Sequence, residues 1–336
     1  MRMFLAAATA MLATQLHAGD IVHVSPDDVG PESIVYWQGE YVGTLEGEDG
    51  EEVLAAQVVA RRNDNYELVL YRGGLPGHGW DPDSGTRRLS ATLSEGRLAF
   101  EGDDYTYQVE NGTIQVGHEE RGSLGALERT FRTSPTLGLG APEGAVVLFD
   151  GTDVDQWRDG ATITDDGLLA QGARTAKEYG DIFVHVEYML PFWDHSGRAN
   201  SGIYIQDRYE VQILDSFGHG RGSSEDGALY RERAPDVNVT LPPYHWQTFD
   251  ILFRAPRFDD DGNKTENVRI SVIHNGVLIH DNVELKGGTG WGGRKEEVPR
   301  EHLYLQQHRG PGLFRNVWLI EDPDDWPEVV RERVFD

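Results

Sequence analysis

The densest group of side chains able to do acid–base or hydrogen-bonding chemistry lies between residues 200 and 215. Alternating residue types predict two strands there, residues 202–206 and 209–214. Successive side chains of a strand point to opposite faces, so Glu210 and Gln212 share one face and the apolar residues beside them face a core. A carboxylate beside an amide makes a polar surface of the size of a sugar ring. On spacing alone, however, an ordinary solvated strand face is the simpler interpretation.

Two further polar residues flank these strands. Asn200 precedes the first predicted strand and Asp215 follows the second. By parity Asp215 falls on the apolar face, so we expect the strand to end or bulge before it. Aromatic faces suit sugars because they join apolar area to polar edges, although each aromatic residue singly is more often a core residue. The aromatic residues of this region are Tyr204, Tyr209, Tyr230, Tyr244 and Trp246.

A second polar group lies near the C-terminus, in residues 304–310 and 314–318. His308 ends one predicted strand, and its reference pKa near neutrality suits a general base. Arg315 begins the next strand and could stabilise a developing oxyanion. A loop histidine and a strand-edge salt bridge are the structural alternatives, and without further information they explain the two residues better.

Other catalytic and metal-binding chemistries have little support. The chain has no cysteine, which excludes disulfides, thiolate metal sites and cysteine nucleophiles. It has neither a His-Glu-x-x-His zinc motif nor a Gly-x-Ser-x-Gly nucleophile elbow. Residues 259–263, Asp-Asp-Asp-Gly-Asn, offer oxygen ligands for calcium but lack a full EF-hand loop, so a solvated hairpin tip is favoured. No strong metal motif is present, and the cofactor stays open, with calcium or another divalent ion as a candidate.

The formal net charge of −27 over 336 residues limits the partners. Nucleic acid is excluded because binding to a phosphate backbone needs clustered Lys and Arg, and anionic membranes are disfavoured for the same reason. A local basic pocket could still override the global field. An uncharged small-molecule substrate, such as an oligosaccharide or glycoside, fits best.

The elements that position these residues are predicted to be strands. Residues 58–60, 66–71 and 105–109 are β-branched or aromatic, and Asn-Gly turns at residues 111–112 and 275–276 mark two hairpins. Only residues 326–334 have a helical pattern. Many short strands between frequent turns indicate an all-β fold, a sandwich or a barrel.

The chain divides into four segments. Residues 1–18 are predicted as a signal peptide, with Arg2, a short apolar run and a small-residue cleavage site, so we expect export to the periplasm or the medium. No stretch is long and apolar enough to insert into a membrane. Residues 19–134 form a small β domain, 135–144 a Gly- and Pro-containing linker, and 145–336 the larger β domain. The glycine-rich loop 73–81 is interpreted as a wide turn pinned by Trp80.

Several motifs in the larger domain together resemble one family, the 3-keto-disaccharide hydrolase domain, over residues 144 to about 321. The residues before it resemble the extension that precedes this domain in a subset of members. The motifs, in chain order, are residues 148–152 with Trp157, then 200–204, 209–216, 246–251, 275–277, 305–306 with His308, and 314–318.

This resemblance implies a concanavalin A-like jelly roll that acts on glycosides oxidised at C3 of the sugar. A C3 ketone acidifies the hydrogen on C2, so a base can form an enolate that expels the C1 substituent, and water then adds to the enone. The implied base is His308 or Glu210. Arg315 and Asn200 would hold the ketone or enolate oxygen.

The remaining candidates have supporting roles in the same interpretation. Gln212 and Asp215 would orient ring hydroxyls or the leaving group, and Tyr204, Tyr230 and Trp246 would contact the substrate. Two departures from the family pattern stand out: Gln307 replaces an expected Asp, which puts the histidine base in doubt, and the loop around residues 227–231 is altered. A non-catalytic sugar-binding protein and a conventional β-glucanase remain the alternative functions.

Overall fold

The computed structural model describes residues 33–47, 50–158, 160–193, 197–290, 292 and 295–336. The predicted signal peptide, residues 1–18, lies outside these described residues. The described chain forms two compact units, residues 33–132 and residues 133–336. None of the described helices is long and apolar enough to cross a membrane.

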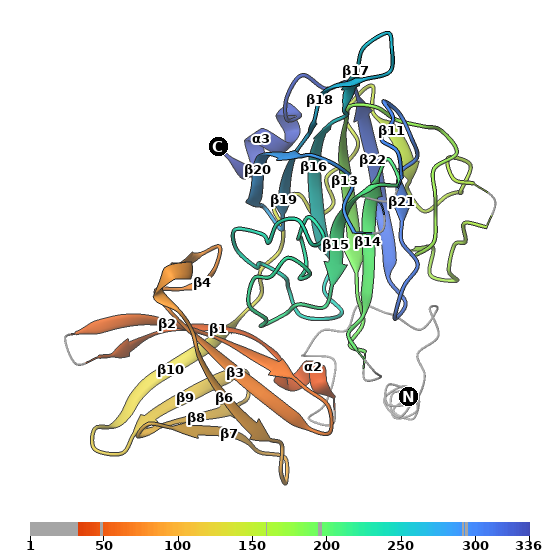
Figure 1. The fold of residues 1–336 in the computed structure, drawn as a ribbon. Helices are drawn as coiled ribbons and strands as arrows, with labels where there is room; N and C mark the ends of the chain where they lie inside the picture. Colours follow the sequence, from red (N-terminus) through yellow and green to blue (C-terminus); the bar gives the residue numbers. More distant parts are fainter. Residues whose placement is uncertain (1–32, 48–49, 159, 194–196, 291, 293–294) are drawn as a thin grey trace. The chain divides into compact units, whose positions relative to one another are not determined.

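The first unit is an antiparallel sheet of eight strands in the order β6-β3-β2-β1-β10-β9-β8-β7 (Figure 1). Hydrogen-bonded neighbours are successive strands of this sheet along the chain. In addition β1, the first of them in the sequence, pairs with β10, the last, as in an up-and-down barrel. The strands are β1 (Gly39–Glu46), β2 (Glu51–Ala60), β3 (Asn65–Arg72), β6 (Arg87–Thr92), β7 (Leu98–Gly102), β8 (Tyr105–Glu110), β9 (Thr113–His118) and β10 (Gly122–Thr130). The end strands β6 and β7 lie next to each other, so the sheet curls into a barrel that is closed there by side chains.

Loop 73–81 packs on the outside of this barrel. Trp80 packs edge-on against Tyr71 and donates from Nε1 to the carbonyl of Gly85 at 3.0 Å. The loop holds two short strands that pair in parallel, and a 3-10 helix follows it. The turn therefore is pinned by Trp80 as the sequence predicts. These elements are β4 (Leu75–Pro76), β5 (Gly79–Trp80) and η3 (Pro82–Ser84), and a short helix α2 (Ile34–Trp37) precedes β1.

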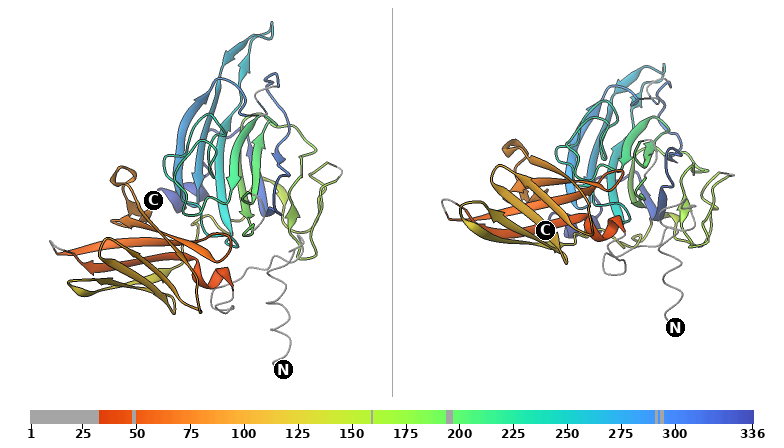
Figure 2. Two further views of the ribbon diagram at one scale, coloured as in Figure 1. Left: turned by 60° about the horizontal axis from the view of Figure 1, so that its bottom comes forward. Right: turned by 90° about the horizontal axis from the view of Figure 1, so that it is seen from below.

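The second unit is a sandwich of two antiparallel sheets (Figures 1 and 2). The larger sheet has the order β11-β22-β13-β16-β19-β20, with β12 also paired to β22, and the smaller has the order β15-β14-β21. The larger sheet's strands are β11 (Val146–Phe149), β12 (Leu169–Ala170), β13 (Ile182–Met189), β16 (Gln247–Arg254), β19 (Val268–His274), β20 (Val277–Leu285) and β22 (Leu313–Glu321). The smaller sheet comprises β14 (Asn200–Ile205), β15 (Tyr209–Leu214) and β21 (Tyr304–Leu305). The all-β fold is confirmed.

Alternate residues of the strands build the core between the two sheets. Val184 of β13 and Ile251 of β16 belong to the same buried apolar cluster as Ile203 of β14 and Val211 of β15. The opposite face of the larger sheet carries a second cluster, which includes Phe183, Trp318 and Val330 of helix α3 (Glu328–Val334). The strands β13, β16, β19, β20 and β22 therefore contribute residues to both the inter-sheet core and the cluster beside α3.

The short turns follow their sequence signals. Asn111-Gly112 and Asn275-Gly276 have positive φ in the turns that join β8 to β9 and β19 to β20, as an Asn-Gly hairpin requires. Residues 259–263 form the tip of the hairpin between β17 (Arg257–Phe258) and β18 (Lys264–Glu266). There Asp259 Oδ1 accepts from the backbone nitrogens of Asp261 and Asn263, so this carboxylate serves its own turn.

The segment predicted as a linker is part of the second unit's packing. Thr136 is fully buried and donates to Asp250 Oδ2 on β16 at 2.7 Å. The carbonyl of Leu139 accepts from Trp318 Nε1 at 3.0 Å. The composition correctly indicates a segment without regular structure, but its hydroxyls and carbonyls satisfy buried polar groups of the larger sheet, so it is an ordered strap.

Candidate functional site

The outer face of the smaller sheet collects the polar side chains expected there. Strands β14 and β15 form a tight hairpin whose turn residues, Gln206 and Asp207, have φ of 52° and 53°. The register places Gly202 opposite Gln212 and Tyr204 opposite Glu210. The intervening apolar residues belong to the inter-sheet core, so these four positions face outward, away from it.

Glu210 lies at the centre of this face. Its Oε2 accepts a hydrogen bond from the Tyr204 hydroxyl at 2.6 Å. With the Gln212 amide oriented so that its nitrogen faces acceptors, that nitrogen donates to Glu210 Oε1 at 3.1 Å. Gly202 makes room for the carboxylate, because a Cβ at this position would lie 2.7 Å from Glu210 Oε1. The neighbours therefore hold the carboxyl group in one place.

The Glu210 carboxyl group is buried although it has no direct cationic partner among the described residues. Only 2% of the residue is exposed. Burial raises its pKa to about 7, against the hydrogen bond from Tyr204 and the charge of Arg231, which both lower it. A carboxyl group with a pKa near neutrality can take up and release a proton under ordinary conditions.

Two loops border the carboxyl group. The carbonyl of Glu210 accepts from the Tyr230 backbone nitrogen, and its own nitrogen donates to Thr289 Oγ1 at 2.8 Å. A Cβ on Gly290 would lie 2.6 Å from the Tyr230 ring and 3.8 Å from Glu210 Oε2. Tyr230, predicted to contact a substrate, thus stands beside Glu210 at the edge of the site.

Gln306 and Tyr304 are site residues that the sequence reasoning missed. Gln306 Nε2 donates to the Tyr204 hydroxyl at 3.4 Å, while its Oε1 is buried and has no hydrogen-bond partner among the described residues. The Tyr304 ring lies 6.1 Å from that of Tyr204, and Arg174 stacks on it at 4.2 Å. The signal available was strand pairing, since β21 joins β14 next to Tyr204.

Asn200 and His308 lie at the other end of the smaller sheet. Asn200 begins β14 on the same outer face, and its backbone nitrogen donates to the carbonyl of Arg309. His308 is exposed, and burial of its ring followed by the charge of Arg309 lowers its pKa. In the described part of the chain its side chain has no hydrogen-bond partner, so it is not held as a base by any neighbour, whereas Glu210 is.

The strand ends before Asp215, as parity predicts. β15 stops at Leu214, and the Asp215 backbone nitrogen bonds to the carbonyl of Ala199. Burial, and to a smaller extent the charge of Asp215, raises the pKa of Asp226 to about 7. Asp215 follows the strand and does not share the outer face of β15 with Glu210, and its role in orienting ring hydroxyls or the leaving group stays a prediction.

Arg315 and Trp246 belong to the other sheet. Arg315 donates from Nε to Glu187 Oε2 at 2.7 Å and stacks over the Trp246 ring at 4.0 Å. Glu187 lies on the face of β13 that points away from the inter-sheet core, beside His185. Arg315 and Trp246 therefore do not share the face that carries Glu210, and the salt-bridge alternative describes the contacts of Arg315. The oxyanion role of Arg315 and the substrate contact of Trp246 stay predictions.

His185, Glu187, Asp250 and Arg315 form an ion-pair cluster under the strap. Burial disfavours the charged form of His185, but Asp250 raises the pKa of His185 to about 9. Burial would also raise the pKa of Glu187, but hydrogen bonds from His185, Asn316 and Arg315 lower it to about 2. The charges neutralise one another, which suits a structural role.

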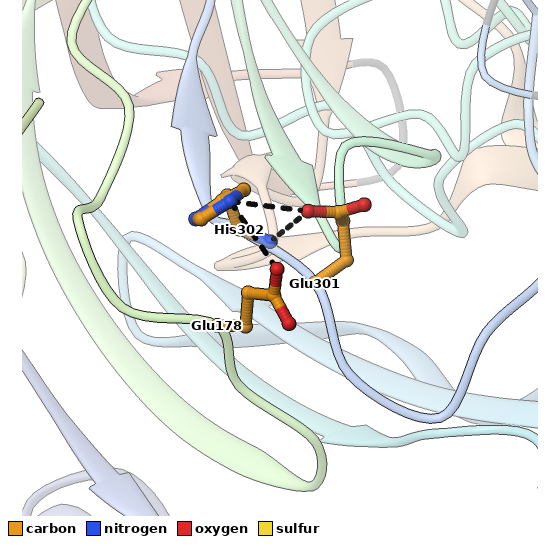
Figure 3. Close-up of side chains that lie close together, drawn as sticks. All are labelled: Glu178, Glu301 and His302. Atoms are coloured by element: carbon orange, nitrogen blue, oxygen red, sulfur yellow. Dashed lines mark hydrogen bonds and ion pairs between the residues drawn. The ribbon is translucent and has the colours of Figure 1, made fainter.

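A histidine and two carboxylates form a candidate metal centre elsewhere in the second unit (Figure 3). His302 Nε2 lies 3.6 Å from Glu178 Oε1 and 3.3 Å from Glu301 Oε1. The Arg158 guanidinium is also in contact with His302 Nε2, the atom that would bind an ion. Because a cation already occupies that position, the group fits an ion-pair cluster better than a metal site.

Comparison with known proteins places the second unit among carbohydrate-acting proteins. Residues 144–320 match the family model described as the 3-keto-alpha-glucoside-1,2-lyase-like domain. A solved structure from Parabacteroides distasonis, named a "putative glycosyl hydrolase", is 30% identical with a TM-score of 0.50, covering 54% of this chain and 85% of that one. Another structure of the same name and organism is 17% identical with a TM-score of 0.41, covering 54% and 95%. No protein of curated function matches the chain.

Proposed function

Because this chain belongs to the 3-keto-alpha-glucoside-1,2-lyase-like domain family, we propose that its second unit cleaves glycosides whose sugar carries a ketone at C3, with Glu210 as the catalytic base. The observation that supports this most directly is the carboxyl group of Glu210, which is buried, hydrogen-bonded by Tyr204 and has a pKa of about 7.

The chemistry needs one base at C2. A C3 ketone acidifies the C2 hydrogen, so the Glu210 carboxylate can remove that proton and leave an enolate. The enolate re-forms the ketone while the C1–O bond breaks, and the leaving alkoxide takes up a proton. The products are an alcohol and an enone, to which water can add at C1 and return a proton to C2. A pKa near 7 serves both the removal and the return of the proton.

The neighbours of Glu210 suit this task. Tyr204 and Gln212 fix the carboxyl oxygens, so the base is held in position before the substrate arrives. Gln306 Oε1 is an unpaired buried acceptor, which is unfavourable by about 1–3 kcal/mol unless water or a ligand supplies a donor. A sugar hydroxyl is a donor of the right kind. Asn200, on the same sheet face, offers an amide for a further hydroxyl.

A conventional retaining glycosidase is less well supported. Such an enzyme needs two carboxyl groups about 5–5.5 Å apart across the scissile bond. On the outer face of β15 the residue two positions from Glu210 is the amide Gln212, and Asp215 lies outside the strand. One base beside hydrogen-bonding amides fits elimination, in which the substrate's own ketone activates the bond.

The test is release of a chromogenic alcohol from a 3-keto-glucoside, with the unoxidised glucoside as a control. We expect release from the keto form alone, and a loss of about a hundredfold or more in Glu210→Gln, the scale on which general bases contribute. Glu266→Gln, which neutralises an exposed carboxylate on β18, is the matched control and should retain full activity.

Three outcomes contradict the proposal. Release from the unoxidised glucoside at the same rate would indicate a conventional glycosidase. Binding of both sugars without release would indicate a non-catalytic sugar-binding protein. Full activity in a folded Glu210→Gln protein would remove Glu210 from the reaction and return attention to His308.

A further inference from the structure

The barrel of the first unit contains a cavity of about 330 Å³ at one end. Eight-stranded barrels have interiors just wide enough for side chains or one small ligand, and small-molecule sites commonly begin at about 300 Å³. Its lining includes buried apolar residues such as Leu54 and Val116, and exposed charged residues, which we take as its mouth. A cavity of this shape could hold a molecule of about the size of a single sugar.

Three arginines line this cavity: Arg72 at the end of β3, Arg87 at the start of β6 and Arg121 before β10. Arg121 donates to the Glu46 carbonyl and, at 3.1 Å, to the Tyr105 hydroxyl, both of which are neutral acceptors. The side chain of Arg72 has no hydrogen bond or ion pair within the described residues. Among the described residues, Arg87 alone of the three has a carboxylate partner, Asp103, at 2.9 Å. Within that part of the chain, Arg72 and Arg121 therefore form no ion pair.

The rest of the cavity wall is held in place by packing. Trp80 donates to the carbonyl of Gly85, and Asp81 Oδ1 accepts from the Asp83 nitrogen, so the 84–86 segment of the wall is fixed. Tyr105 and Tyr107 stack with their ring centroids 6.3 Å apart on β8, and both line the cavity. Through Trp80, the glycine-rich loop therefore supports one segment of the cavity wall.

We propose that this cavity binds a small hydrophilic anion of sugar size, in which a carboxylate or phosphate group is held by Arg72 and Arg121. Guanidinium groups match the two oxygens of either anion with paired donors. The chain as a whole has a charge of −27 and repels anions, so an anion bound here would depend on the local charge of these arginines. The exposed carboxylates Glu46 and Glu52 also line the mouth, where they can accept from ligand hydroxyls.

This proposal is independent of the reaction assigned to the second unit, and calorimetry on the full chain at low ionic strength can test it. The probes are glucuronate, glucose 6-phosphate and glucose, which share a size and differ in their anionic group. We expect one or both anions to bind and neutral glucose not to bind at the same concentration. A stronger signal from glucuronate or from glucose 6-phosphate would distinguish carboxylate from phosphate as the preferred group.

The variants Arg72→Gln and Arg121→Gln should each weaken binding about tenfold or more, since a hydrogen bond to a charged group contributes about 1.5–3 kcal/mol. Arg97→Gln removes an exposed arginine from a turn of the same unit outside the cavity and should leave affinity unchanged. Equal binding of all three probes, binding of none at millimolar concentration, or equal losses in all three variants would each overturn the proposal.

Discussion

Replacing Glu210 by Gln should stabilise the fold at high pH while it removes the proposed base. The carboxyl group is 2% exposed, and its pKa is raised by burial from an ordinary 4.5 to about 7. The folded protein therefore binds one more proton than the unfolded chain between these two pH values. Stability is lost as pH rises through this window, because the folded state resists the charge. The glutamine retains an oxygen that can accept from Tyr204 but never ionises.

The size of the effect follows from the two pKa values. A difference of about 2.5 between them corresponds to about 3 kcal/mol, which is reached in full above pH 7. At pH 5 the same relation leaves about 1 kcal/mol. The variant should therefore exceed the original protein in free energy of unfolding by about 3 kcal/mol at pH 8 and by about 1 kcal/mol at pH 5. Asp226 also has a raised pKa of about 7, but it is common to both proteins and cancels in the difference.

Urea unfolding at pH 5 and pH 8, followed by tryptophan fluorescence, measures this difference. Most of the eight tryptophans lie after residue 133, so the signal reports mainly on the second unit. Glu266→Gln is the control, because its exposed carboxylate should give no pH-dependent difference. A variant that gains nothing between pH 5 and pH 8, or that is less stable than the original at pH 8, would refute the inference that Glu210 is a strained buried charge.

Four further predictions follow from the same contacts. Gly202→Ala should reduce turnover at least about tenfold with little change in Tm, because its Cβ would displace the Glu210 carboxylate, whereas Gly220→Ala, with open space around it, should do neither. Turnover should rise with pH through about 7. Tyr204→Phe should move that rise to higher pH, because it removes a hydrogen bond that holds the pKa of Glu210 down; an unchanged profile would contradict this. Glu187→Gln should destabilise the second unit by about 1–3 kcal/mol at pH 7 in urea unfolding, because Arg315 loses its carboxylate partner while His185 keeps only Asp250; a loss under 1 kcal/mol would show that the pair with Arg315 is not needed. If residues 1–18 are a signal peptide, the exported protein should begin at Gly19 on N-terminal sequencing, and a retained Met1 would contradict this.

Local rules predicted the part of the site that is local. Strand parity alone places Glu210 and Gln212 on one face, and the hairpin register adds Tyr204 and Asn200. The end of the strand before Asp215 also followed from parity, because a carboxylate is unfavourable in an apolar core. These residues lie within 16 positions of one another, so no knowledge of the tertiary fold was needed.

Tertiary pairing decided the rest. Arg315 and Trp246 were grouped with Glu210 because they share family motifs, but β22 and β16 belong to the larger sheet, and no local pattern states which sheet a strand joins. Gln306 lies within a motif of the resemblance but was given no role, because its place beside Tyr204 follows only once β21 is known to pair with β14. The strap, residues 135–144, was predicted as a linker from its composition, because the burial of Thr136 depends on a strand more than a hundred residues away.

The covalent connection between the anchored ends of the two units is one residue long. Arg132 is anchored in the first unit by two hydrogen bonds of 2.6 Å to Glu40, and Ser134 is anchored in the second by a hydroxyl contact of 2.6 Å with Thr248. Thr133 alone lies between the anchors, and the two flanking Cα atoms can be at most about 7 Å apart. Such a joint limits how far apart the two anchors can lie and leaves rotation about its own backbone dihedral angles free. Separating the units by protein engineering would therefore require a spacer inserted at Thr133, since cutting on either side removes an anchor.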